Sequence, residues 1–234
     1  MDAEEVTLHD DLDGQVALVT GANRGIGAVI AADLAALGAT VYAGARDPDA
    51  VTAADQRPVA LDVTDDDGMV AAIDRIADEA GRLDVLVNNA AVTDGGDPLD
   101  EQDPAAIDRT LRTNLHGPVH LTRHALGLLL DREGGRVVNV SSGMGALDGM
   151  GGGSPAYRVS KTGLNGLTTY LHGEYRRDGL IPNSVCPGWV RTDMGGSRAP
   201  RSPEQGADTP VWLARFAPGS PGGLFWRDRT AIDW

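Results

Sequence analysis

The sequence predicts a single α/β domain in which a doubly wound, parallel sheet of about seven strands carries helices on both faces. Two observations predict it. Short apolar runs typical of buried strands alternate along the chain with longer stretches of helical period. The first of these strands, at residues 16–20, leads directly into a glycine-rich turn and then into a helical pattern. We expect the domain to span residues 15–234, after a polar lead-in at residues 1–14.

The charge of the chain narrows the range of partners. A net charge of -14 argues against a nucleic-acid partner and against binding to an anionic membrane surface, since phosphate groups would be repelled. An acidic chain with a single lysine also suggests a halophilic protein, adapted to high salt, although GC-rich coding explains the scarcity of lysine equally well. Stabilisation by molar KCl would distinguish the two explanations.

Cysteine and histidine usage argues against disulfides and metal sites in this chain. One cysteine, Cys186, excludes an internal disulfide and suits a reducing compartment. The five scattered histidines show no metal-ligand spacing, so we expect no metal. The chain has no run of about 18 apolar residues, and its acidic start does not resemble a secretory signal. We therefore expect a cytoplasmic protein that acts on a small molecule.

The glycine-rich turn at residues 20–27 has the context of a dinucleotide-binding fingerprint, because it connects a strand to a helix. Gly21 allows a tight turn, Gly25 allows the backbone to approach a pyrophosphate, and Gly27 allows the helix to pack closely on the strand. The free amide groups and positive dipole end of the helix would bind phosphate. An ordinary tight turn is the simpler alternative for this motif taken alone.

The end of the second strand, at residues 40–44, indicates which dinucleotide is preferred. A site for NAD would be expected to carry an acid there, bonded to the ribose 2′-hydroxyl. This strand instead ends in Gly44, Ala45 and Arg46, and Arg24 lies inside the glycine turn. Two arginines suit a 2′-phosphate, so we expect NADP(H) to be preferred. NAD(H) is still possible because Asp47 is close by.

Tyr157 and Lys161 are the strongest candidates for chemistry. Lys161 is the only lysine in the chain and follows the tyrosine by four positions. On a helix these two side chains would share one face. A neighbouring ammonium favours phenolate, so we expect Lys161 to lower the pKa of Tyr157 and to make it a usable proton donor near neutral pH.

Together these motifs resemble the short-chain dehydrogenase/reductase family, and most nearly its carbonyl-reductase-like branch. The glycine spacing of residues 21–27, the asparagines at 88–89, the serines at 141–142, the Tyr157–Lys161 motif and the Pro187-Gly188 segment occur in the family's order. The resemblance implies that Tyr157 and Lys161 also contact the cofactor. It implies further cofactor contacts from Asn23, Arg24, Ile26, Arg46, Asp62, Val63, Asn89, Ala90, Pro187, Gly188, Val190 and Thr192.

The resemblance also implies a catalytic set of Asn114, Ser142, Tyr157 and Lys161. In it, Ser142 polarises the substrate carbonyl, Tyr157 exchanges the proton, Lys161 tunes the tyrosine, and Asn114 anchors a water that connects the lysine to solvent. Ser141 is a less favoured alternative to Ser142. The serine-to-tyrosine spacing is two residues longer than is usual in the family, and the glycine-rich residues 148–154 would absorb the difference.

The implied activity is the NADP(H)-dependent interconversion of a ketone or aldehyde and an alcohol by hydride transfer. Three alternatives stay open: an NAD-dependent alcohol dehydrogenase of the same family, a sugar epimerase or dehydratase of related fold, and a dinucleotide-sensing protein without turnover. The epimerase alternative would need a substrate domain that this chain has no room for. The apolar helix expected at residues 104–131 often pairs with its symmetry mate in the family, which suggests a homodimer or homotetramer.

Overall fold

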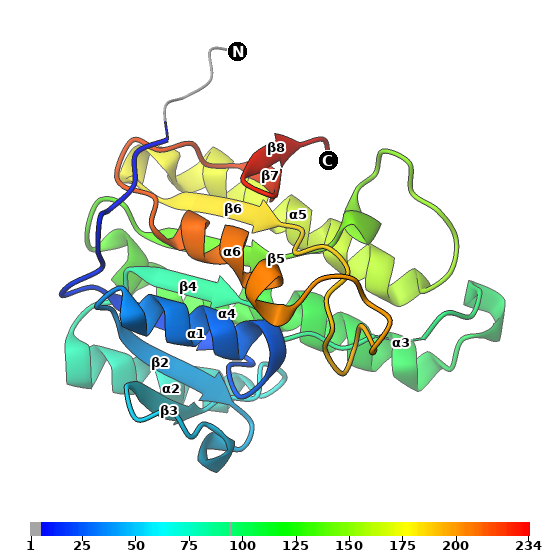
Figure 1. The fold of residues 1–234 in the computed structure, drawn as a ribbon, viewed down its shortest axis with the longest axis horizontal. Helices are drawn as coiled ribbons and strands as arrows, with labels where there is room; N and C mark the ends of the chain where they lie inside the picture. Colours follow the sequence, from blue (N-terminus) through cyan, green and yellow to red (C-terminus); the bar gives the residue numbers. More distant parts are fainter. Residues whose placement is uncertain (1–5, 94) are drawn as a thin grey trace.

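A computed structural model describes residues 6–93 and 95–234 of the protein, and within them eight strands form one sheet in the order β3-β2-β1-β4-β5-β6-β7-β8 (Figure 1). All neighbouring strands are parallel except β7 and β8. The strands are β1 (Val16–Thr20), β2 (Thr40–Ala45), β3 (Gln56–Ala60), β4 (Val85–Asn88), β5 (Arg136–Val140), β6 (Ile181–Val185), β7 (Leu224–Arg227) and β8 (Thr230–Ile232). The α-helices are α1 (Gly25–Ala36), α2 (Asp66–Ala80), α3 (Pro104–Leu111), α4 (Gly117–Leu130), α5 (Pro155–Tyr175) and α6 (Pro203–Ala214).

Helices cover both faces of the sheet, which confirms the predicted doubly wound α/β fold. Helices α1 and α6 pack on one face, and α2, α4 and α5 pack on the other (Figure 1). Strand β1 shows why its sequence is continuously apolar: Ala17 and Val19 enter the first core, whereas Val16 and Leu18 enter the second. Because both faces are buried, the strand has no polar side to expose.

The order of the strands places a crevice at the carboxyl edge of the sheet. Strand β1 pairs with both β2 and β4, so the direction of winding reverses there. In open α/β sheets, ligands bind at this switch point, outside the carboxyl ends of the strands. The glycine turn, Arg46, Asp62, Asn89, Ser142 and Pro187 each follow the carboxyl end of a strand within two residues. Segments far apart in the sequence therefore meet at one edge.

The apolar residues 224–226 predict a last edge strand from the sequence, and the observed end of the chain differs from that expectation. Those residues form β7, but β7 lies inside the sheet and pairs in parallel with β6. The edge is β8, which forms a hairpin with β7 through Asp228 and Arg229. Both hairpin residues have positive φ, 50° and 58°, as a type I′ turn requires. Neither is the Asn or Gly that usually signals such a turn, which is why the sequence did not predict β8.

The helix predicted at residues 104–131 is interrupted by a π-helical turn. It consists of α3, the π-turn η3 (Arg112–His116) and α4. A π-turn inserts one extra residue and leaves a backbone carbonyl without its normal helical partner, and such turns are frequent at functional sites. Asn114 lies at the centre of η3 and is completely buried.

The lead-in predicted at residues 1–14 lies partly outside the described residues, which begin at Val6. From there the segment packs against the domain. Leu8 forms an isolated bridge with Phe216, Leu12 is completely buried in the first core, and the His9 amide donates to the Arg215 carbonyl at 2.8 Å. Residues 6–14 thus cover the end of α6. In the parts of the chain that the structure describes, no helix is long and apolar enough to cross a membrane.

Candidate active site

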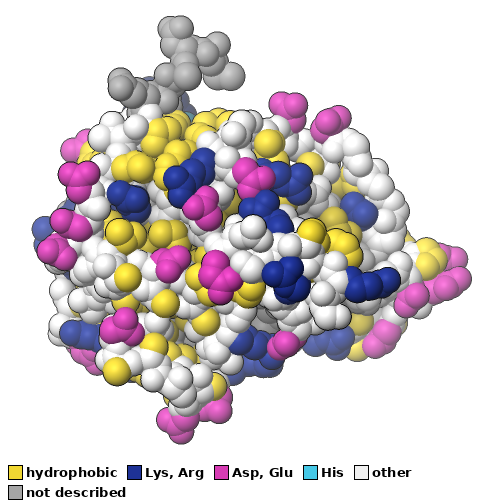
Figure 2. Space-filling view, viewed as in Figure 1, with side chains coloured by type: hydrophobic (Ala, Val, Ile, Leu, Met, Phe, Trp, Pro, Cys, Tyr) yellow, Lys and Arg dark blue, Asp and Glu magenta, His cyan; other side chains and the backbone are white. Residues whose placement is uncertain are grey.

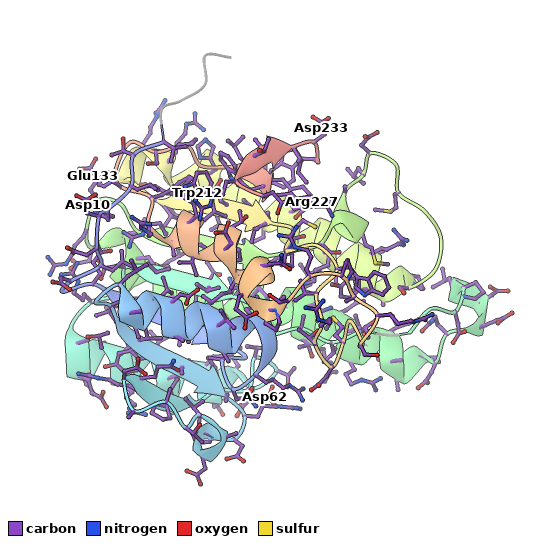
Figure 3. The ribbon with its side chains drawn as sticks, viewed as in Figure 1. Asp10, Asp62, Glu133, Trp212, Arg227 and Asp233 are labelled. Carbon is purple, nitrogen blue, oxygen red and sulfur yellow. The ribbon has the colours of Figure 1, made fainter. Side chains whose placement is uncertain are left out.

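A cleft of about 1210 Å³ runs along the carboxyl edge of the sheet. Every residue predicted to contact the cofactor lines it, as do Ser142, Tyr157 and Lys161. Asp62 after β3 and Arg227 at the end of β7 lie toward opposite ends of this edge (Figure 3). The cleft exceeds the roughly 300–1,000 Å³ typical of a small-molecule pocket, so a dinucleotide and a substrate can share it.

The glycine turn has the shape of a phosphate cradle. Gly21 and Gly25 have φ values of 65° and 56°, which favour glycine. A Cβ on Gly27 would lie 2.3 Å from the Gly21 carbonyl oxygen and 2.4 Å from Asn89 Nδ2. No side chain caps the N-terminus of α1 at Arg24, so the first amide groups of the helix are available to a phosphate in the cleft. These residues therefore fit a bound dinucleotide.

Replacing Gly27 with alanine should damage both the fold and the cradle. The new methyl group would collide with backbone of the turn, and overpacking of this kind costs about 1–3 kcal/mol. We expect Gly27→Ala to lower the free energy of unfolding by that amount in a urea titration and to weaken NADPH binding. Gly127→Ala, on the exposed side of α4 with nothing within 4 Å of its Cβ, is the matched control. Gly127→Ala should leave the free energy of unfolding unchanged or raise it. Equal stability and equal NADPH affinity of the two variants would contradict the role of Gly27 in a phosphate cradle.

The predicted adenosine end of the cleft contains Arg46 just after β2, with no acid on the strand end itself. The Asp47 carboxylate caps the short helix η1 (Pro48–Ala50), where its Oδ1 accepts from the Asp49 amide at 3.1 Å. Asp62 similarly accepts from the Thr64 amide and hydroxyl, at 2.9 and 2.7 Å. Arg24 forms an exposed ion pair with Asp193, at 2.7 Å, from the glycine turn to the segment after β6.

The two candidate catalytic hydroxyls are hydrogen bonded to each other. Ser142 is the second residue after β5, and Tyr157 lies in the first turn of α5. Their side chains form a hydrogen bond within the cleft, and Ser142 Oγ also accepts from the Met144 amide at 3.1 Å. Ser141, the alternative serine, is 2 % exposed and donates to the Lys161 carbonyl at 3.3 Å. That bond gives Ser141 a structural role in holding α5, and leaves Ser142 as the serine beside the phenol.

The electrostatics of Tyr157 correct one expectation. We expected Lys161 to lower the pKa of the phenol, but the pKa of Tyr157 is raised. The main cause is burial, which disfavours phenolate. The hydrogen bond with Ser142 opposes this shift, and the nearby Cys186 adds to it. At neutral pH, Tyr157 therefore carries the proton that a reduction would require.

Lys161 lies on the same face of α5 as Tyr157, as the spacing predicted. Its Nζ is 5.7 Å from the centroid of the tyrosine ring and donates to the Val140 carbonyl at 2.8 Å. The side chain is 2 % exposed, and burial lowers its pKa from 10.5 to about 8. An ammonium that is this costly to bury indicates a functional position more than a stabilising one.

Asn114 does not line the cleft and lies one layer behind it. Its side chain accepts from the Val92 amide and donates to the Val92 carbonyl, both at 2.8 Å, and it donates to Ser160 Oγ at 3.2 Å. Asn114 therefore joins the segment after β4 to α5 near Lys161. The amide is fully engaged with protein groups, so its contribution to the cleft comes through these contacts and through the π-turn that contains it.

Several residues of the cleft were not predicted from the sequence as site residues. They include Arg109 on α3, Thr113 in η3 and Arg227 at the end of β7. Arg227 was missed because the direction of its strand was unknown. If the strand is known to run parallel to its neighbours, its last residue, Arg227, is expected at the carboxyl edge of the sheet. No group of three or more His, Cys, Asp or Glu side chains suited to a metal ion occurs in the described ranges.

Comparison with known proteins places the chain in a family. Residues 15–202 match the family model described as short chain dehydrogenase. The pig protein named carbonyl reductase [NADPH] 1 (Sus scrofa) is 35% identical, with 94% of each chain covered, and the human protein of that name is 34% identical, with 94% and 98% covered. The structure of NADPH-bound carbonyl reductase from chicken fatty liver has a TM-score of 0.86 at 26% identity, over 96% of each chain. The protein belongs to the short-chain dehydrogenase family.

Proposed function

We propose that the protein is an NADPH-dependent reductase of ketones or aldehydes, with Tyr157 as the proton donor. The observation that carries the proposal is the hydrogen-bonded pair of Ser142 and Tyr157, which shares one cleft with Lys161 and the glycine cradle. Two adjacent hydroxyls can both contact one carbonyl oxygen, so that one polarises the carbonyl while the other gives a proton to the oxygen as the carbonyl is reduced. Relatives at 33–36% identity are named carbonyl reductase [NADPH] or oxidoreductase.

Each catalytic side chain has a distinct task in this proposal. Bound NADPH supplies the hydride that reduces the carbonyl carbon. Ser142 donates a hydrogen bond to the carbonyl oxygen and stabilises the negative charge that develops there. Tyr157, kept protonated by its raised pKa, gives its proton to that oxygen. The Lys161 ammonium stabilises the resulting phenolate, and the π-turn around Asn114 offers a backbone carbonyl for a water that returns the proton.

The preference for NADPH rests on the adenosine end of the cleft. Arg46 lines it, and no carboxylate of the described residues lies within ion-pair distance of Arg46. The neighbouring acid, Asp47, is engaged by its own turn. A guanidinium without an ion-pair partner favours a 2′-phosphate over a 2′-hydroxyl.

The test of the cofactor proposal is a fluorescence titration with NADPH and, separately, with NADH. We expect the wild type to bind NADPH more tightly. Arg46→Gln should lose about 10- to 100-fold in NADPH affinity, the size expected for a charge-assisted hydrogen bond, with little change for NADH. Arg132→Gln, an exposed arginine between α4 and β5, is the control and should behave like the wild type. Tighter binding of NADH by the wild type would favour an NAD-dependent alcohol dehydrogenase instead.

A dinucleotide-sensing protein without turnover is the alternative from a different class. The intact set of Ser142, Tyr157 and Lys161 argues against it, because binding alone needs no proton donor hydrogen bonded to a second hydroxyl. Binding of NADPH without turnover of any ketone or aldehyde in a broad panel would favour the sensor.

A homodimer or homotetramer is also part of the proposal. Val119 on α4 is 38% exposed, and Val159 and Tyr170 on α5 are each 58% exposed, so these two helices offer apolar side chains to a second copy. Light scattering of the purified protein measures the mass directly. A monomer at micromolar concentration would contradict this part.

A further inference from the structure

The guanidinium of Arg227 lies beside the catalytic pair. The backbone at the end of β7 is tied to the end of β6, where the Cys186 amide donates to the Trp226 carbonyl at 2.8 Å. From there Arg227 Nη2 donates to Cys186 Sγ at 3.1 Å. The same sulfur accepts from the amide of Gly143, the residue after Ser142, at 3.1 Å. Arg227 lines the cleft and is exposed within it (Figure 3).

Arg227 differs from its neighbours in forming no direct ion pair among the described residues, although its charge acts on the adjacent Asp228 carboxylate. Arg201 is paired with Asp228, and Arg229 with Asp208, at 2.7 Å and about 2.5 Å. The Asp228 carboxylate is thus directed toward Arg201, although it is next to Arg227 in the chain. The bond to Cys186 uses one donor of a group that has five, and sulfur is a weak acceptor.

An arginine with a purely structural role would be expected to donate several hydrogen bonds to backbone carbonyls. Arg136 is 3% exposed and donates to the carbonyls of Ala214 and Gly134. Arg191 donates to the carbonyls of Ala199 and Pro200. These two arginines hold the backbone with several bonds each. Among residues 6–93 and 95–234, Arg227 forms one weak side-chain hydrogen bond, to Cys186, and its guanidinium is exposed at the cleft.

The whole cleft carries an excess of positive charge, in contrast to the protein. Six cationic residues line it, whereas its acids are Asp47, Asp62 and Asp193, each of which accepts a local hydrogen bond or ion pair. On the face in Figure 2, acidic and basic side chains are mixed, and several of the basic ones lie on the right half, over the loops at the carboxyl ends of the strands. The cationic residues are Arg24, Arg46, Arg109, Lys161, Arg191 and Arg227. Such a cleft in a chain of charge -14 attracts anions.

We infer that the carbonyl substrate carries a carboxylate close to its reacting carbonyl, and that Arg227 binds this carboxylate. The inference rests on the proposed reduction. The glycine turn and Arg46, which would hold the cofactor phosphates, follow β1 and β2, whereas Arg227 ends β7, beyond β4, β5 and β6 in the strand order. A planar guanidinium can bind a carboxylate with two parallel hydrogen bonds. Arg227 would therefore orient an oxo acid, with its ketone oxygen toward Ser142 and Tyr157.

The test compares an oxo acid with its ester, phenylglyoxylate and methyl phenylglyoxylate, by kcat/KM with NADPH. The ester is the more reactive ketone, so the quantity to compare is the acid-to-ester ratio across variants. We expect Arg227→Met to lower this ratio about 10- to 100-fold, mainly through KM for the acid. Arg229→Met, which removes a surface ion pair two residues away, should leave the ratio unchanged, and Arg227→Lys should give an intermediate ratio.

An unchanged ratio in Arg227→Met would overturn the inference and leave the reductase proposal intact. Failure of the wild type to reduce either compound, or any neutral aldehyde, while it binds NADPH would overturn both. A second measurement needs no variant: benzoate should inhibit ester reduction by the wild type about tenfold more strongly than benzamide. Equal inhibition by the two would also overturn the inference.

Discussion

Tyr157→Phe should reduce carbonyl turnover by about 10²- to 10⁴-fold while NADPH still binds, because the change removes the proton donor and keeps the aromatic ring. The phenol is hydrogen bonded to Ser142 in the cleft, and burial keeps it protonated. Without it, the developing alkoxide has only Ser142 and water as proton sources. The measurement is kcat for NADPH oxidation with a ketone, together with a fluorescence titration of NADPH.

A second tyrosine on the same helix provides the control. Tyr170 lies on α5 and is 58% exposed outside the cleft, so Tyr170→Phe should keep the kcat of the wild type. Turnover by Tyr157→Phe within a factor of about ten of the wild type would refute the role of Tyr157. An equal loss of activity in Tyr157→Phe and Tyr170→Phe would also refute this role, since the loss would then reflect damage to the helix and not removal of the Tyr157 hydroxyl.

Lys161→Met should nearly abolish activity and yet make the protein more stable at neutral pH. The lowered pKa, from 10.5 to about 8, corresponds to about 3 kcal/mol spent on burying the ammonium. Methionine has a similar length and needs no desolvation of charge, although the hydrogen bond to the Val140 carbonyl is lost at a cost of about 1–2 kcal/mol. We expect a net gain of about 1–2 kcal/mol in the free energy of unfolding, measured with urea.

The direction in which stability changes with pH follows from the lowered pKa of Lys161. Because the folded state holds the proton of Lys161 less tightly than the unfolded state, the wild type gains stability as pH rises from about 8 to 10.5. The advantage of Lys161→Met should therefore shrink over that range. Activity should change in the opposite direction, since the wild type loses the ammonium, and with it the stabilisation of phenolate, as pH rises through about 8.

A variant that is both inactive and less stable than the wild type at every pH would contradict this account of Lys161. The stability of Tyr157→Phe provides a comparison, because that variant keeps the buried ammonium. It should show the pH dependence of the wild type between about pH 8 and 10.

Much of the fold was predictable because local sequence signals and topology agree. The glycine turn at residues 20–27 lies between a strand and a helix, as the printed sequence indicates, and Gly27 proves to have no room for a side chain. Residues at the ends of parallel strands must meet at one edge of the sheet. That rule is sufficient to bring the serines at 141–142 near the asparagines at 88–89 without any knowledge of distances.

The parts that were not predictable depend on long-range packing. The direction of the Tyr157 pKa shift depends on how deeply the phenol is buried, which the four-residue spacing to Lys161 does not specify. The engagement of Asp47 by its own turn depends on the backbone of η1. Arg227 reaches Cys186 and the cleft only because β7 pairs in parallel with β6. Each case needed neighbours that are distant in the sequence or a local backbone that no motif encodes.

The most direct test of the central claim follows the hydride. The protein would be incubated with a ketone and NADPH that carries deuterium at both C4 positions, and the product would be analysed by mass spectrometry. The account predicts an alcohol with deuterium on the former carbonyl carbon, formed by the wild type and strongly reduced in Tyr157→Phe. An alcohol without deuterium, or no alcohol from a folded protein that binds NADPH, would contradict it.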